Sequence, residues 1–264
     1  MEIPSFWQKQ EKPLFPDLEW NFPEKKQGTV SVIGGNSQNF SSVNFVSGKM
    51  AQNFPIENVV SILPDALKKK IPPVPGVEFM PSTDSGSFKK SSELSSALAS
   101  ADFNLLIGDF SKNSETAVAV SEAIKKSEKP ILLTRDTIDL VLNDAQDFIE
   151  KENLFFVGSM AQIQKLFRAV YYPKVLLLSM PIIPVVEALH KFTITYPCTI
   201  LTFHEGQILV ASHGEIISTP LEKTPYSPLT LWSGELAARI VAFNLFNQKK
   251  PLEATVSAIP FRKS

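Results

Sequence analysis

The sequence has a single cysteine, Cys198, and no cluster of cysteines and histidines at metal-binding spacing. One cysteine excludes an intrachain disulfide and is typical of a reducing compartment. Its apolar neighbourhood, TYPCTILTF, predicts a buried small side chain rather than a nucleophile. The histidines His190, His204 and His213 are scattered along the chain, and we expect them to be structural or exposed rather than catalytic.

Long apolar runs are also missing. A membrane-spanning helix needs about 18 apolar residues or more, and the nearest run, VLLLSMPIIPVV, is shorter and is broken by prolines. The first residues, MEIPSFWQKQEKP, show no basic segment followed by an apolar one, so no signal peptide is expected. We therefore expect a cytoplasmic protein without a membrane partner.

Neither sign of charge dominates. The formal net charge is -1 and 44% of the residues are hydrophobic, which argues against a nucleic-acid partner. The phosphate loop G-x-x-x-x-G-K-[ST], the dinucleotide turn G-x-G-x-x-G and the nucleophile elbow G-x-S-x-G are all absent. The composition leaves the oligomeric state open, a homo-oligomer included.

What the sequence does contain is an alternation of strand and helix signals. Short apolar runs predict strands at 29–35, 58–64, 77–81, 103–109, 130–136 and 154–158. Helical spacing predicts helices at 114–126 and 159–170, the first of them capped by Asn113. This alternation is typical of an α/β fold with a mostly parallel sheet flanked by helices. Residues 1–27 are predicted to form an irregular arm, and residues 28–264 a single α/β domain.

The last third of the chain has a different pattern. We predict a helix at 182–192, a strand at 198–203 and a small β-hairpin at 207–217 that turns near His213-Gly214. A proline-rich loop then leads to a buried helix that opens at Ser233-Gly234-Glu235.

Two strand ends are the first places to look for a ligand. In an open parallel sheet, ligands bind outside the carboxyl ends of the strands, and two of these ends are Gly108-Asp109 and Arg135-Asp136. Asp136 and Asp139 have the chemistry to bind Mg²⁺ or a ligand hydroxyl, or to cap the helix that follows. From these residues alone the cap is favoured.

Two glycine-containing turns have similar alternatives. The turn Gly34-Gly35-Asn36 follows the first strand of the domain, so it either lets backbone N–H groups approach an anionic or polar ligand or is a plain turn. Ser233-Gly234-Glu235 either binds phosphate and supplies a base or is an ordinary helix start with an acid in its first turn. The helix start is favoured where nothing else is known.

Four segments, in order, carry a resemblance to one family. They are GTVSVIGGNS, the block from FNLLIGDF to RDTIDLV, TILTFHEGQILVASHGEI, and WSGELAARIVAFNLFNQKKPLEATVSA. Together they resemble the ADP/ATP-dependent NAD(P)H-hydrate dehydratases, ribokinase-like enzymes that repair hydrated nicotinamide cofactors. The second segment resembles the family's IGPG…ET…KP…DADALNLL block, and the fourth its GTGD helix.

The resemblance implies a fold, a ligand set and a site. The fold is ribokinase-like, with a small hairpin near the nucleotide; ATP or ADP with Mg²⁺ is the nucleotide, and the NAD(P)H hydrate is the substrate. Glu235 is then the catalytic base. The phosphate-binding positions are Ser233, Gly234, Trp232 and Thr202, and the substrate-binding positions are Gly34, Gly35, Asn36, Gly108, Asp109, Asp136 and Asp139.

The chain departs from the family pattern on its ligand-facing turns. GTGD reads Trp232-Ser233-Gly234-Glu235, IGPG ends in Asp109-Phe110, and only the second aspartate of DADALN is kept. Three hypotheses follow. The first is a divergent dehydratase, the second a non-catalytic nucleotide- or metabolite-binding protein on the same fold, and the third a sugar or vitamin-precursor kinase, which matches the segments less well.

Overall fold

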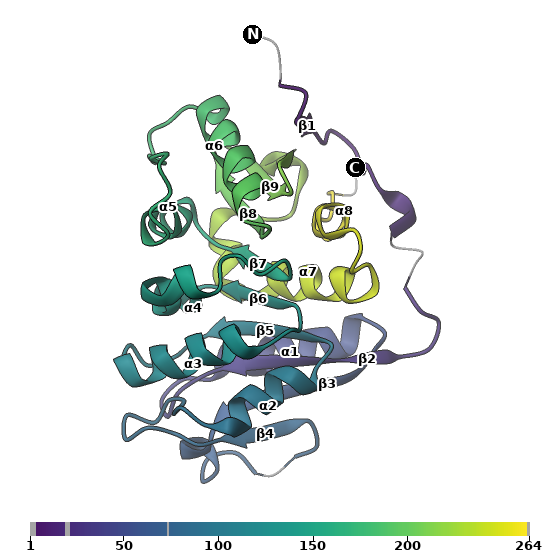
Figure 1. The fold of residues 1–264 in the computed structure, drawn as a ribbon. Helices are drawn as coiled ribbons and strands as arrows, with labels where there is room; N and C mark the ends of the chain where they lie inside the picture. The colour runs from purple at the N-terminus through teal and green to yellow at the C-terminus, as the bar shows by residue number, and fades with distance from the viewer. Residues whose placement is uncertain (1–3, 19–21, 73, 263–264) are drawn as a thin grey trace.

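The computed structural model describes residues 4–18, 22–72 and 74–262. Its centre is one ten-stranded sheet with the order β1-β10-β9-β8-β7-β6-β5-β2-β3-β4, which runs from top to bottom in Figure 1. The strands are β1 (Trp7–Lys9), β2 (Gln27–Gly34), β3 (Ile56–Pro64), β4 (Val77–Met80), β5 (Phe103–Gly108), β6 (Ile131–Thr134), β7 (Leu154–Val157), β8 (Thr199–His204), β9 (Gln207–Ser212) and β10 (Glu215–Pro220).

The strands from β4 to β8 are all parallel, and β9 is antiparallel to both β8 and β10. The predicted mostly parallel α/β sheet is therefore confirmed. Two-residue turns join the antiparallel strands, at Glu205-Gly206 and at His213-Gly214, and all four of these residues have positive φ. Such turns match the right-handed twist of the strands they join, and the second is the turn that the sequence predicts.

Helices cover both faces of the sheet. They are α1 (Ser41–Asn53), α2 (Ser92–Ser100), α3 (Ser114–Lys126), α4 (Asp136–Val141), α5 (Met160–Ala169), α6 (Ile182–Thr195), α7 (Glu235–Phe246) and α8 (Pro251–Ser257). Short 3₁₀ helices lie at η1 (Pro16–Leu18), η2 (Asp65–Leu67), η3 (Leu142–Asp147), η4 (Leu221–Lys223) and η5 (Pro228–Ser233).

Successive strand residues point to opposite cores. Leu106 packs with the core that α2 to α6 cover, whereas Leu105 and Ile107 pack with the core under α1, α7 and α8. Burial on both faces explains why the central strands read as unbroken apolar runs.

The predicted helix starts are made by side-chain caps. The Asn113 Oδ1 accepts the Thr116 N–H at 2.7 Å, and Ser159 with Gln162 forms a reciprocal capping box on α5. Lys125 and Lys126 lie in the last turn of α3, where the helix dipole favours positive charge. These local signals explain why α3 occupies the predicted residues.

The arm that precedes β2 contributes to the sheet. Its strand β1 pairs in parallel with β10, and the buried Trp7 donates its Nε1–H to Ser218 Oγ at 2.9 Å.

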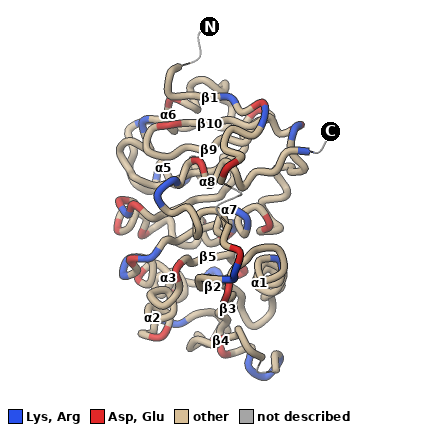
Figure 2. Tube along the Cα trace, turned by 90° about the vertical axis from the view of Figure 1, so that its right-hand side faces the viewer, with Lys and Arg blue, Asp and Glu red and all other residues tan. Residues whose placement is uncertain are grey.

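Lys and Arg are interspersed with Asp and Glu on the face that Figure 2 shows. In the described part of the chain, no helix combines the length and the apolar character that a membrane crossing requires.

Candidate functional site at the carboxyl edge of the sheet

The turns after β2 and β5 touch each other. The Gly35 N–H donates to the Gly108 carbonyl at 2.9 Å, and a Cβ on Gly34 would lie 2.3 Å from that same oxygen. Gly35 and Gly108 have φ values of 92° and 97°, which favour glycine. The glycines at both strand ends are therefore required by a close approach of two backbones.

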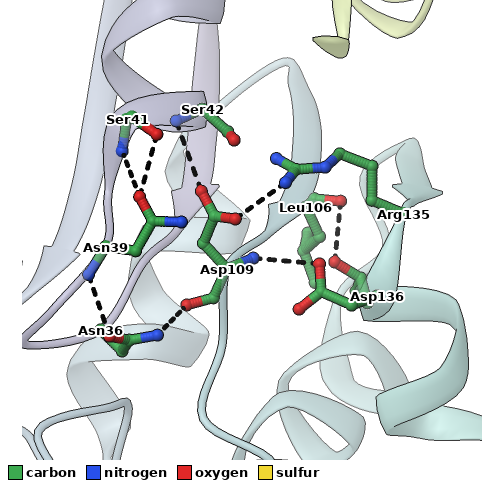
Figure 3. Close-up of polar contacts among 9 residues, drawn as sticks. Asn36, Asn39, Ser41, Ser42, Leu106, Asp109, Arg135 and Asp136 are labelled. Carbon is green, nitrogen blue, oxygen red and sulfur yellow. Dashed lines mark hydrogen bonds and ion pairs between the residues drawn. The ribbon is translucent and has the colours of Figure 1, made fainter. Parts of the chain in front are cut away.

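Asp109 is held through all of its polar groups (Figure 3). Its carbonyl accepts the Asn36 Nδ2–H at 2.6 Å, and its N–H donates to Asp136 Oδ1 at 3.1 Å. One carboxylate oxygen accepts the Ser42 N–H at the start of α1, at 3.3 Å, and the other is 2.8 Å from Arg135 Nη2. Three of the predicted substrate-binding positions, Asn36, Asp109 and Asp136, are thus joined in one network.

Arg135 and Asp109 form a buried ion pair. The two side chains are 12% and 5% exposed, so solvent screens the pair little. Both residues have positive φ, 54° and 61°, which is uncommon for residues other than glycine and costs about 1–3 kcal/mol each. The Arg135 Nε and Nη1 are buried and have no hydrogen-bond partner in the described residues.

Asp136 is the first residue of α4, and its carboxylate does not cap that helix. It accepts the N–H of Asp109 instead, so the capping role favoured from sequence is wrong. Burial raises the pKa of Asp136 above its ordinary value of 3.8, although the Asp109 N–H and the Arg135 charge oppose the shift. A Cβ on Gly108 would lie 2.1 Å from Asp136 Oδ1, so no larger residue fits there.

Asp139 lies one helical turn further along α4 and contacts α5. Its carboxylate accepts hydrogen bonds from Gln162 Nε2 at 2.8 Å and from Lys165 Nζ at 2.6 Å. Gln162 also donates to the Arg135 carbonyl at 2.6 Å. This amide therefore fixes the strained backbone of Arg135 relative to α4 and α5.

Beside this network is a cavity of about 670 Å³. This volume lies in the range of small-molecule pockets. Its lining combines aromatic, amide and charged side chains, among them Phe110, Lys112, Asn113, Asp136, Asp139 and Trp232. Trp232 is 48% exposed and lines the cavity, so we expect its ring to be available to a ligand. Two predicted substrate positions, Asp136 and Asp139, and one predicted phosphate position, Trp232, thus share a single cavity.

The start of α7 packs on the same edge but is hydrogen-bonded internally. The Gly234 N–H donates to the Leu231 carbonyl at 3.3 Å, and the Glu235 N–H donates to Ser233 Oγ at 3.2 Å. Gly234 has a φ of 75°, and a Cβ there would lie 2.6 Å from Ile107 at the end of β5.

The Glu235 carboxylate makes no hydrogen bond or ion pair with the described part of the chain. Its charge acts on Tyr226, whose pKa burial raises to about 12. Arg239, one turn after Glu235 on the same helix face, opposes that shift.

Thr202, a predicted phosphate-binding position, is not among the residues that line the cavity. It is fully buried in β8, and its hydroxyl has no hydrogen-bond partner among the described residues. Cys198 is buried as predicted, and burial raises the pKa of its thiol to about 12, so it is not a reactive thiolate. His190 packs on Phe6, with ring centroids 3.6 Å apart.

Two backbone donors that a phosphate at the start of α7 would use are already hydrogen-bonded. A phosphate at the start of α7 requires backbone N–H donors, and those of Gly234 and Glu235 already have acceptors. Within the ranges that the structure describes, no three His, Cys, Asp or Glu side chains are grouped to hold a metal ion.

Comparisons with known proteins agree on the fold. A ribokinase-like superfamily protein from Enterococcus faecalis superposes with a TM-score of 0.68 at 13% identity, over 97% of this chain and 87% of that one. The fold is ribokinase-like. The ADP/ATP-dependent NAD(P)H-hydrate dehydratase of Bacillus subtilis, co-crystallised with ATP and Mg²⁺, gives 0.57 at 12% identity, over 94% of this chain and 86% of that one.

A third ribokinase-like neighbour is a kinase. The pyridoxal kinase of Staphylococcus aureus, in complex with AMP-PCP and pyridoxal, gives a TM-score of 0.51 at 13% identity, over 89% of this chain and 85% of that one. No protein-family model and no curated protein matches the sequence. At these identities the neighbours establish the architecture, and a more specific function is a matter for proposal.

Arg135 and Gln162 are central to the network, yet the sequence patterns give Arg135 only a strand-end position and Gln162 no role. The strand-end position of Arg135 was a usable signal, because β5 and β6 are neighbours and their ends therefore meet. Gln162 carried no signal beyond its place in the capping box.

Proposed function

We propose that this chain is a small-molecule-binding protein on the ribokinase-like fold, and that it does not catalyse phosphoryl transfer. The observation that carries the proposal is the buried Asp109–Arg135 pair at the end of β5. A carboxylate and a guanidinium fill the place where the resemblance leads us to expect a glycine turn. The cavity beside them supplies the binding site.

The start of α7 supports the same proposal. Phosphoryl transfer depends on donors that are aimed at the developing charge before the reaction begins. Here the 3₁₀ helix η5 and the Ser233 hydroxyl use the amides that would serve. Releasing them would break two hydrogen bonds for each phosphate bound.

The cavity indicates what kind of ligand the protein binds. The half-exposed Trp232 ring favours a ligand with a flat ring, because ring stacking buries apolar area in a defined orientation. The amide of Asn143 and the ammonium of Lys112 offer polar contacts at the same wall. A heteroaromatic metabolite or nucleotide meets both requirements.

Binding is tested by thermal shift and calorimetry with ATP, ADP, NADH and pyridoxal as probes. We expect at least one probe to bind, and Trp232→Ala to weaken it by about tenfold, the loss of a stacking contact of roughly 1.4 kcal/mol. Leu229→Ala is the matched control, since Leu229 is also an exposed residue of η5 but does not line the cavity. Equal effects of the two variants would contradict the proposed site.

A second candidate is the divergent NAD(P)H-hydrate dehydratase. It is favoured by Glu235, whose carboxylate stands at the positive end of α7 with no hydrogen-bond or ion-pair partner in the described chain, and so is available as a base. The assay is restoration of NADH from its hydrate with ATP or ADP and Mg²⁺. Turnover that Glu235→Gln abolishes and Glu253→Gln leaves intact would establish this function and reject our first proposal.

A further inference from the structure

The apolar run that is too short to cross a membrane is exposed in the folded chain. It lies in the α5–α6 segment, residues 170–181, which passes along the left side of the molecule in Figure 1. Residues 175–186 contain no charge, and the side chains of Val175, Leu177 and Leu178 are all exposed. Single exposed apolar residues are ordinary, whereas several close together mark an interaction surface.

The α5–α6 segment is firmly attached to the fold although these side chains face solvent. Leu176 is buried, and its carbonyl accepts the Gln164 Nε2–H of α5 at 2.6 Å. The Met180 carbonyl accepts a hydrogen bond from His204 Nε2 at 2.7 Å. The exposed leucines therefore lie between two fixed points, so little conformational freedom has to be lost when they bind a partner.

The end of α5 holds a tyrosine in a conformation that tyrosine disfavours. The Tyr171 N–H donates to the Arg168 carbonyl at 3.0 Å, and the Tyr172 N–H donates to the Phe167 carbonyl at 2.9 Å. These are the two hydrogen bonds of a Schellman helix end, whose left-handed residue is usually glycine. Here that residue is Tyr171, with a φ of 51°. Its side chain is 81% exposed, so the fold gains little from the ring, and strain of this kind points to a function.

A hollow of about 440 Å³ lies beside the α5–α6 segment. Its floor is firm, because the rings of Phe167 and Phe192 stack beneath it with centroids 4.1 Å apart, and Tyr172 and Tyr196 pack on Phe192. The same face therefore offers apolar projections and an aromatic recess next to them. The hollow is lined by Tyr172, Pro173, Lys174, Lys191, Thr195 and Tyr196.

The charges around the hollow have both signs. Lys174 and Lys191 line it, and the Glu187 carboxylate is 3.7 Å from Lys174 Nζ. Burial and then the Glu150 charge raise the pKa of Tyr196, so a second acid acts at the hollow. An anionic lipid surface or a nucleic acid requires a uniformly basic rim. A rim of both signs, beside projections and a recess, is instead complementary to itself.

We propose that the α5–α6 segment and the hollow form the interface of a two-fold dimer of this chain, in which Val175, Leu177 and Leu178 of one copy enter the hollow of the other. A two-fold interface pairs the same patch on both copies, so each projection and each recess is used twice. Tyrosine is enriched in such interfaces, which gives Tyr171 its role. None of these residues lines the cavity of about 670 Å³, so the inference is independent of the proposed binding function.

The test is the oligomeric state of the full chain, measured by sedimentation equilibrium over a concentration series. We expect a reversible species of twice the chain mass. Leu178→Glu places a charge on the apolar surface of both copies, and should weaken the dimer at least about tenfold. Leu229→Glu is the matched control, because Leu229 is an exposed leucine outside the segment, and it should dimerise as the wild type does.

Tyr171→Gly distinguishes an interface role from a structural one. Glycine adopts the left-handed position without strain. In the monomeric Leu178→Glu background, Tyr171→Gly should therefore raise the melting temperature. In the wild-type background the same change should weaken the dimer, because the exposed ring is lost. If Leu178→Glu does not fold, Val175→Glu replaces it in both experiments.

Three results would overturn the inference. The first is a chain that stays monomeric throughout the concentration series, and the second is a dimer that Leu178→Glu leaves unchanged. The third is a monomer that cosediments with phosphatidylserine vesicles and loses this binding in Leu178→Glu, which would assign the surface to lipid. None of these results bears on ligand binding in the cavity.

Discussion

The strand ends of β5 and β6 and the start of α7 meet at one edge of the sheet, yet they are built differently. At the strand ends, charged side chains from different elements bind one another out of solvent, and two residues are strained. At the start of α7, short-range hydrogen bonds within residues 230–235 satisfy the backbone, and the one carboxylate is unpaired in the described chain. A substitution at the strand ends should therefore destabilise several elements at once, whereas a substitution at the start of α7 should affect only that helix start.

The largest expected effect comes from breaking the ion pair on one side. Arg135→Ala leaves the Asp109 carboxylate buried without its counter-charge, and should lower the free energy of unfolding by about 3–5 kcal/mol. Urea denaturation measures this free energy. The exposed Arg168→Ala is the control, and its free energy of unfolding should lie within about 0.5 kcal/mol of the wild-type value. The double variant Asp109→Asn with Arg135→Gln should lose less than the sum of its single variants, because neither leaves an unpaired charge in it.

If Arg135→Ala costs less than about 1 kcal/mol, the pair is solvated in solution and the contrast between the two regions disappears.

The next effect concerns the glycine between the strand and the network. Gly108→Ala would force a positive φ and place a Cβ 2.1 Å from Asp136 Oδ1, whereas Gly206→Ala meets only the positive φ, with no atom within 4 Å. Both force an alanine into a positive φ, which costs about 1–2 kcal/mol, and Gly108→Ala should lose a further 1–3 kcal/mol or so from overpacking. Equal melting temperatures for the two variants would show that Asp136 moves aside freely.

A smaller effect, with a defined sign in pH, comes from Asp136. Burial raises the pKa of the Asp136 carboxyl above 3.8. Between pH 3.8 and the folded-state pKa, the folded state therefore binds more protons than the unfolded state. The stabilisation is present below the ordinary pKa and is lost as the pH rises through the folded value. Asp136→Asn keeps an acceptor for the Asp109 N–H, so it should be more stable than the wild type at pH 7.

That gain should shrink as the pH falls below 3.8, as measured by melting temperature across a pH series. If Asp136→Asn is less stable than the wild type at pH 7, the attraction of the Arg135 charge for the Asp136 carboxylate outweighs the cost of burying that carboxylate.

These contrasts also explain how far the sequence could be interpreted. The spacing of apolar residues and the capping side chains are local features of the sequence. The helix α3 and the hairpin at His213-Gly214 could therefore be predicted from their own residues. The strand-end rule brought Asp109 and Arg135 to one edge. It could not pair them, because the direction of each side chain depends on a left-handed backbone that neither residue favours by itself.

The same limit applies to Asp136 and Thr202. An aspartate at a helix start usually caps it, and only the contact with Asp109 diverts this one. Thr202 is a phosphate-binding position only by the resemblance, which gives a place on a strand without saying which layer of the core the side chain enters. Tertiary contacts decide both cases, and a pattern read along one chain does not contain them.

The smallest expected effect is at Glu235, and it sharpens the comparison most directly. Glu235→Gln and Asp109→Asn each remove one negative charge at the same edge of the sheet. Glu235 gives up at most a charge–dipole contact, about 0.5 kcal/mol, whereas Asp109→Asn strands a buried guanidinium and should cost several times more. Urea denaturation of the two variants side by side makes the measurement. If they lose equal stability, Glu235 is bound into the fold as tightly as Asp109, and the start of α7 belongs to the same network as the strand ends.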